Sequence, residues 1–218
     1  MKYQKSINNK ILPGIIAIIG LFAIVTQLYV NLTTDKEHLG AVEHILRYFT
    51  YFTILTNTLV VICCISVLLG KDNFFARPKV LSATAVYITI VAVIYNAVLR
   101  NLFVLTGINI LLNEILHVIV PALFVLYWLF FVSKQNLQWK DALPWLWYPF
   151  IYLIVVLIRG ALSNYYPYPF IRVSEIGYGK ALLNSLFVTI AFLVVSILFI
   201  ALAKWMSKKR MGKDVRHN

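Results

Sequence analysis

The chain has 218 residues, of which 61% are hydrophobic and only 13% are charged. A typical soluble domain is about 45–50% apolar and about 25% charged. With a mean hydropathy of +0.82, this composition excludes an ordinary soluble fold. The formal net charge of +12 would suggest nucleic acid in a soluble protein, but in a membrane protein it is first a signal of topology, so we expect no nucleic-acid partner.

Six apolar stretches are long enough to cross a bilayer, because about 20 helical residues span a hydrocarbon core of about 30 Å. In chain order they cover residues 11–30, 45–69, 80–99, 110–132, 143–162 and 181–203. The runs are continuous, which favours helices over the alternating strands of a β-barrel, and no signal-peptide cleavage site follows the first run. We therefore predict an all-α polytopic membrane protein with six transmembrane helices in a single integral membrane domain, 1–218.

Most of the 20 Lys and Arg residues fall at the two ends of the chain and in the connections after the second and fourth helices. Cytoplasmic segments of membrane proteins are enriched in these residues, so we predict that the N- and C-termini are cytoplasmic. The short basic tail then serves as an anchor near anionic lipid. The absence of a long soluble appendage favours a multi-pass protein of a bacterial cytoplasmic membrane.

Polar side chains gather in the half of each helix that this orientation places toward the outer face. They are Arg47, Thr50, Thr53, Thr56 and Asn57 on the second helix, Asn96 and Arg100 on the third, Asn113, Glu114 and His117 on the fourth, Arg159 on the fifth, and Asn184 and Ser185 on the sixth. The inner halves are mostly Val, Ile, Leu, Phe and Ala. Because polar residues within membrane helices are functional candidates by default, we predict a polar pocket open to the outer leaflet.

Each of these residues also has an ordinary structural alternative. Membrane threonines commonly bond the carbonyl four residues earlier or join helices. The Arg47 and Arg159 side chains could extend to the outer headgroups. Glu114 could simply form an ion pair with Arg100 or Arg159.

A metal site is a poor interpretation of these residues. Only His117 and Glu114 are well-placed ligands, whereas a catalytic zinc needs three protein ligands. The sequence has neither a phosphate-binding glycine loop nor the Gly-x-Ser-x-Gly element of common serine hydrolases. We therefore expect no metal and no cofactor.

Three short motifs carry a resemblance to a known family. They are YFTILTN at 51–57, LNEILHVIVP at 112–121, and YPF at 168–170. With these motifs in the same order, the chain resembles the androgen-induced and androgen-dependent integral membrane proteins and their bacterial six-span relatives. The eukaryotic members are threonine hydrolases that cleave fatty-acid esters of hydroxy fatty acids, using a Thr on one helix and a His on another.

The resemblance implies Thr53 as the nucleophile and His117 as its general base, with Thr50 and Thr56 each one turn away as alternatives. A Thr hydroxyl is a weak nucleophile that needs an adjacent base. Glu114 or Asn113 could orient the imidazole, since they precede His117 by three and four residues on one helix.

Stabilisation of an oxyanion is the second requirement of such a site. Asn57, Asn96 or Arg100 could supply the donor, since a dry site makes hydrogen-bond donors effective. The expected partner is a membrane lipid ester that reaches the site from the outer leaflet.

Two other functions stay open. One is a non-enzymatic six-helix protein that binds a lipid or a small molecule. The other is a transporter, which we rank lower because transporters usually show internal repeats and polar residues near the midplane.

Overall fold

The computed structural model describes residues 2–34, 39–70, 73–102 and 104–214, with side chains from residue 10 to residue 208 within these ranges. Every regular element in the described ranges is helical. The α-helices are α1 (Lys2–Thr33), α2 (Ala41–Tyr48), α3 (Phe52–Leu69), α4 (Pro78–Ile94), α5 (Ile108–Glu114), α6 (Val120–Phe131), α7 (Ala142–Trp145), α8 (Trp147–Ser163) and α9 (Val173–Asp214). A π-helical turn at Tyr95–Leu99 extends α4. A second π-helical turn, at Ile115–Ile119, joins α5 to α6.

Six helical segments of the described chain are long and apolar enough to cross a membrane, which confirms the predicted all-α class and number of spans. They are Lys10–Thr33, Phe52–Leu69, Pro78–Leu102, Ile108–Phe131, Trp139–Ser163 and Val173–Lys208. Large apolar side chains are exposed along α1, α8 and α9. Such a surface suits lipid, because its apolar side chains avoid water there and its helices satisfy their own backbone hydrogen bonds.

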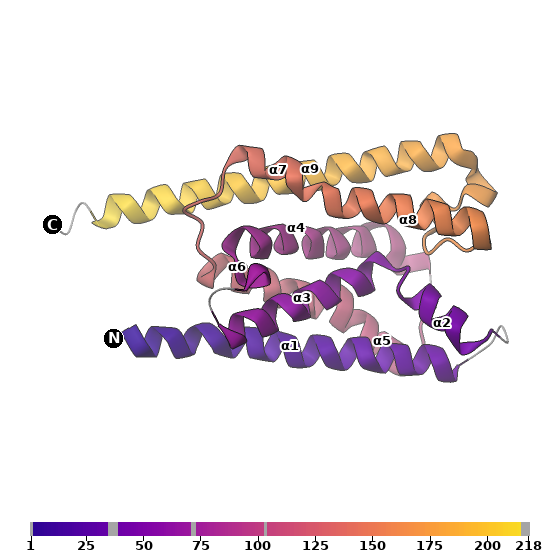
Figure 1. The fold of residues 1–218 in the computed structure, drawn as a ribbon, viewed down its shortest axis with the longest axis horizontal. Helices are drawn as coiled ribbons and strands as arrows, with labels where there is room; N and C mark the ends of the chain where they lie inside the picture. Colours follow the sequence, from indigo (N-terminus) through magenta and orange to yellow (C-terminus); the bar gives the residue numbers. More distant parts are fainter. Residues whose placement is uncertain (1, 35–38, 71–72, 103, 215–218) are drawn as a thin grey trace.

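The helix α4 lies at the centre of the bundle, where it contacts α3, α6 and α9. Figure 1 shows α1 along one side, α8 and α9 along the opposite side, and α3, α4 and α6 between them. The most apolar window of the span Pro78–Leu102 is 61% buried, whereas that of Trp139–Ser163 is 11% buried. The protein therefore has a packed core centred on α3 and α4, with α1, α8 and α9 as more exposed outer helices.

The second predicted span, 45–69, is wrong at its start. The chain leaves the helix after Tyr48 and resumes helical geometry at Phe52, so that α2 and α3 are separate. The residues around this break are aromatic or β-branched, which are mediocre helix formers. The Thr50 carbonyl freed by the break accepts a hydrogen bond from the Tyr152 hydroxyl at 2.9 Å.

The sixth predicted helix, 181–203, is too short. The helix α9 begins at Val173 and bends at Gly177, whose φ of 75° is accessible to glycine at little cost. The connection between α8 and α9 is therefore confined to 164–172. This short loop lies against the start of α3, where the predicted nucleophile is found.

Candidate functional site

The contact between Thr53 and His117 lies at the start of α3. Thr53 stands in the first turn after the break and is buried. Its Oγ1 lies 3.2 Å from Nε2 of His117, and Nδ1 of the same ring lies 3.0 Å from the main-chain oxygen of Asn113. Because a carbonyl oxygen can only accept, Nδ1 carries the imidazole proton and Nε2 accepts from the Thr53 hydroxyl.

His117 lies within the π-helical turn Ile115–Ile119. The sequence explains this turn through Pro121, which lacks an N–H and whose ring would clash with the carbonyl four residues earlier, that of His117. A wider turn relieves such a clash, and π-turns of this kind are frequent at functional sites.

Glu114 and Asn113 differ in their contact with the imidazole. Glu114 forms an ion pair with Arg100 at 2.8 Å, and the structure gives it no hydrogen bond to His117 within the described residues. Of the two residues expected to orient the imidazole, Asn113 does so, through its main-chain carbonyl. Glu114 instead forms the ion pair with Arg100 that was its structural alternative.

Tyr95 packs against the face of the His117 imidazole ring. Its ring stacks on that of His117, with centroids 3.8 Å apart and planes 25° apart, and its hydroxyl accepts a hydrogen bond from the Asn113 amide. Tyr95 opens the other π-helical turn, Tyr95–Leu99. Tyr95 could not be singled out from the sequence, since it is one of many aromatic residues in apolar runs.

Asn57 links α3, which holds Thr53, to the π-helical turn that holds His117. It is fully buried, and its Nδ2 donates to the Thr53 carbonyl at 2.9 Å and to the Leu116 carbonyl at 3.1 Å. Both amide hydrogens are thus used. Asn57 therefore positions Thr53 beside His117, and its placement argues against the expected role as an oxyanion donor.

The structure separates Thr53 from the two alternative threonines. The Thr50 hydroxyl donates to the Leu46 carbonyl at 2.7 Å and accepts from Arg159 at 3.1 Å. The Thr56 hydroxyl pairs with that of Tyr148 at 3.3 Å. Of the three threonines, Thr53 is the one in contact with His117.

The remaining predicted residues form two polar groups away from Thr53. Asn96 is exposed, donates to the Ala92 carbonyl and accepts from Arg100, whose guanidinium faces Glu114. Neither Asn96 nor Arg100 is directed at the Thr53 hydroxyl. Their placement therefore does not support the expected role as oxyanion donors.

Arg159 forms an ion pair with Glu43 at 3.0 Å, and Arg47 bonds the same carboxylate at 2.9 Å. The hydrogen bond from Arg47 and the charge of Arg159 lower the pKa of Glu43. Glu43 was missed in the sequence because it precedes the predicted second span. Asn184 and Ser185 bond main-chain carbonyls near the start of α9.

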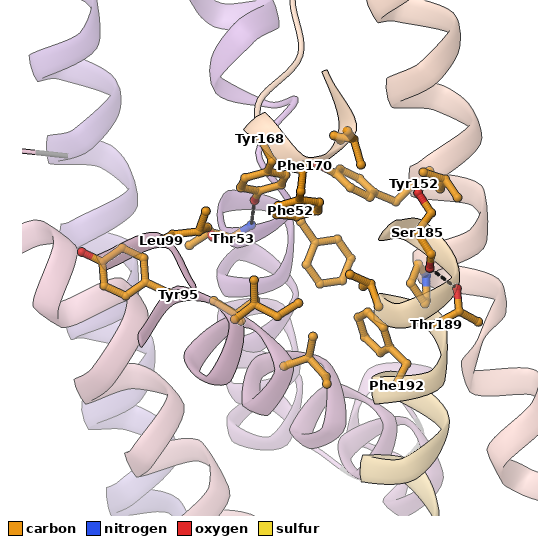
Figure 2. A pocket seen from close by; sticks show the side chains of 17 residues that line it. Phe52, Thr53, Tyr95, Leu99, Tyr152, Tyr168, Phe170, Ser185, Thr189 and Phe192 are labelled. Carbon is orange, nitrogen blue, oxygen red and sulfur yellow. Dashed lines mark hydrogen bonds between the residues drawn. The ribbon is translucent and has the colours of Figure 1, made fainter. Parts of the chain in front are cut away.

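Two cavities meet at Thr53, and one is more polar than the other. The more polar cavity has a volume of about 250 Å³ and is bordered by the amides of Gln27, Asn31 and Asn113 together with His117. The other has a volume of about 80 Å³ and an apolar lining from α3, α4, α8 and α9, which Figure 2 shows from close by. The residues that line both cavities are Thr53, Tyr95, Leu99 and Tyr168.

Tyr168 is a further functional candidate that could not be singled out from the sequence. Its hydroxyl oxygen accepts a hydrogen bond from the Thr53 main-chain N–H at 3.4 Å (Figure 2). The only sequence signal was its place in the motif YPF at 168–170, to which no role was attached.

The described residues include no group of three or more His, Cys, Asp or Glu side chains that could hold a metal ion. Comparison of the chain with family models, with curated proteins and with solved structures gives no match in any of the three. The site is therefore interpreted from its own residues. They form a buried Thr–His pair between an apolar cavity and a larger, more polar one, in a chain with six helices long and apolar enough to span a membrane.

Proposed function

We propose that this protein is an integral membrane hydrolase of a lipid ester, in which Thr53 is the nucleophile and His117 the general base. The observation that carries the proposal is the contact between Thr53 Oγ1 and His117 Nε2, with the Asn113 carbonyl holding the proton on Nδ1. This arrangement of nucleophile, base and orienting group is the signature of an activated hydroxyl. It matches the roles implied by the resemblance to the androgen-induced membrane hydrolases.

The reaction follows the usual two steps of acyl transfer. Nε2 of His117 takes the hydroxyl proton as Oγ1 of Thr53 attacks the ester carbonyl carbon, and the resulting imidazolium gives that proton to the departing alcohol. Water then attacks the acyl-threonine, again with His117 as base. This step releases the carboxylic acid and restores the hydroxyl.

The two cavities support a lipid ester over a water-soluble one. The acyl chain would enter the apolar cavity, where Phe52, Ile90 and Phe192 replace the hydrocarbon of the bilayer. The more polar alcohol side of the ester fits the larger cavity beside Gln27 and Asn31. The carbonyl would then lie at Thr53, which borders both.

The orientation that we propose places the site in the outer leaflet. The start of α1 and the end of α9 lie at one end of the bundle, and α2 lies at the other (Figure 1). With the basic ends of the chain on the cytoplasmic side, Thr53 and His117 face the outer half of a bacterial cytoplasmic membrane. A C-terminal fluorescent-protein fusion that fluoresces, together with a C-terminal alkaline phosphatase fusion that is inactive, is the expected outcome; the opposite pair would reverse the orientation.

The function is tested by labelling the purified protein with a lipophilic fluorophosphonate and by assaying hydrolysis of long-chain aryl esters. Wild type should label and hydrolyse, whereas Thr53→Ala and His117→Gln should lose both, by about 10²–10⁴-fold for the base. Thr56→Ala, on the same helix, and Thr50→Ala, in the break just before it, are matched controls and should keep both activities. A folded wild-type protein that neither labels nor hydrolyses any ester would contradict the hydrolase and favour a lipid-binding protein.

A further inference from the structure

The Thr–His pair accounts for a nucleophile and a base, but not for the negative charge that forms on the carbonyl oxygen. Acyl-transfer enzymes place a hydrogen-bond donor at that point, and the loss of one donor commonly costs about 10²–10³-fold in rate. The amide of Asn57 is committed to two main-chain carbonyls, and Arg100 is paired with Glu114. A donor must therefore come from another residue that borders the reacting hydroxyl.

Tyr168 borders it from the loop between α8 and α9. The residue lines both cavities, as Thr53 does, and Figure 2 shows its hydroxyl directed at the start of α3. The phenol oxygen accepts the Thr53 N–H at 3.4 Å. A phenol that accepts one hydrogen bond still has its own O–H to donate.

The helix end behind Tyr168 makes this O–H a better donor. The first N–H groups of a helix have no partner within the helix and carry a partial positive charge. Tyr51, the N-cap residue of α3, provides no side-chain cap, so the Thr53 N–H is free to bond the phenol. A hydrogen bond received by an oxygen polarises its O–H, which strengthens the bond that this O–H gives.

The loop holds the phenol rigidly in place. Prolines flank Tyr168 on both sides, its ring stacks on Phe170 at 5.3 Å with planes 3° apart, and Tyr51 packs against its edge. Burial raises the pKa of the Tyr168 phenol, which keeps the proton on the oxygen at neutral pH. A fixed, protonated donor needs no reorganisation when charge develops beside it.

We infer that Tyr168 is a catalytic residue that donates its phenolic hydrogen bond to the oxyanion formed at Thr53, with the N-terminus of α3 acting through it. The inference rests on the proposed hydrolase function and adds the third component of that site. No proton is transferred in this role: the hydrogen bond strengthens as the tetrahedral intermediate forms and weakens as the intermediate collapses.

The first test is Tyr168→Phe, which removes the hydroxyl and keeps the ring. We expect kcat for aryl-ester hydrolysis to fall about 10²–10³-fold with KM nearly unchanged, because the bond is made in the transition state. Tyr165→Phe is the matched control: it lies in the same loop, its hydroxyl faces Tyr51 at 2.8 Å, and it should keep wild-type rates. A Tyr168→Phe protein within about threefold of wild type would overturn the inference, while labelling and hydrolysis by wild type would leave the hydrolase intact.

A second test distinguishes a catalytic hydroxyl from a structural one. Fluorinated tyrosines placed at position 168 differ little in size but make the phenol a stronger donor. We expect kcat to change systematically with the acidity of the substituted phenol, while the unfolding temperature stays constant. A loss of rate in Tyr168→Phe without any dependence on phenol acidity would assign Tyr168 a purely structural role and overturn the inference.

Discussion

Helices α3 and α4 and the span from α5 to α6 differ between their two ends. At the end that holds Thr53, the chain breaks before α3, α4 widens into a π-turn over Tyr95–Leu99, and a second π-turn joins α5 to α6. Toward the other end the same helices are regular, and they pack around Trp128, whose indole N–H donates to Ser82 at 2.8 Å. Regular helices leave few backbone groups free, so the irregular end is where main-chain atoms can serve a site.

Two of these irregularities supply components of the Thr–His arrangement. The break before α3 frees the Thr53 N–H for Tyr168. The turn at Ile115–Ile119 brings His117 to Thr53 and to the Asn113 carbonyl. Non-helical backbone at membrane depth is tolerated where it is buried in protein or lines a cavity, and both conditions hold here.

The largest effect is expected when the helix backbone at the Thr53 end is made regular, because this removes the difference between the two ends. Pro121→Ala removes the cause of the second π-turn, so the helix through α5 and α6 should straighten and rotate His117 away from Thr53. We expect the rate of fluorophosphonate labelling to fall about 10²-fold, as for a misplacement of about 1 Å, with an unchanged or higher unfolding temperature because Ala is the better helix former. Pro144→Ala, in α7, is the control that should label normally; a normal rate in Pro121→Ala would contradict the role of the turn.

A second comparison uses two buried residues that form hydrogen bonds: Asn57 at the irregular end of the bundle and Ser82 at the regular end. Asn57→Ala removes the bonds to the Thr53 and Leu116 carbonyls and should cost about 1–3 kcal/mol of stability and slow labelling as well. Ser82→Ala leaves the Trp128 indole N–H without its partner and should cost about as much stability while labelling stays at the wild-type rate. The measurements are thermal unfolding in detergent and labelling kinetics on both variants. Equal effects on labelling would show that the two ends are not functionally distinct.

The smallest expected effect concerns which cavity holds the acyl chain. Ser185 borders the apolar cavity from α9, so Ser185→Leu should shorten the acyl chain that the site accepts. We expect the ratio of kcat/KM for long over short acyl esters to fall about 10-fold, the lower end of what one methylene contributes in an apolar pocket. Ser185→Ala keeps the cavity open and should preserve the wild-type ratio. An unchanged chain-length profile in Ser185→Leu would place the acyl chain elsewhere.

The spans and the polar residues could be predicted because both depend on local composition. Apolar runs of sufficient length identify six helices, and Thr53, His117 and Asn57 stand out against the Val, Ile and Leu around them. The break at Phe49–Tyr51 could not be predicted, since neither Gly nor Pro marks it and the liberated Thr50 carbonyl is satisfied by Tyr152 from a distant helix.

The details of the site depended on contacts that no local pattern contains. Helical spacing offered both Glu114 and Asn113 as partners of His117, and the structure shows that the Asn113 main-chain carbonyl is the one in contact. Tyr168 meets Thr53 across 115 positions of the sequence, so its role could only be inferred once the loop was seen against α3. Departures from local rules of this kind concentrate at functional sites.

The most direct test of the account is to find the residue that carries the covalent adduct. Wild-type protein labelled with the fluorophosphonate is digested, and the modified peptide is sequenced by mass spectrometry. The account predicts one adduct, on Oγ1 of Thr53, which is lost in His117→Gln. An adduct on Thr50, Thr56 or a serine, or one on Thr53 that forms equally fast without His117, would contradict it.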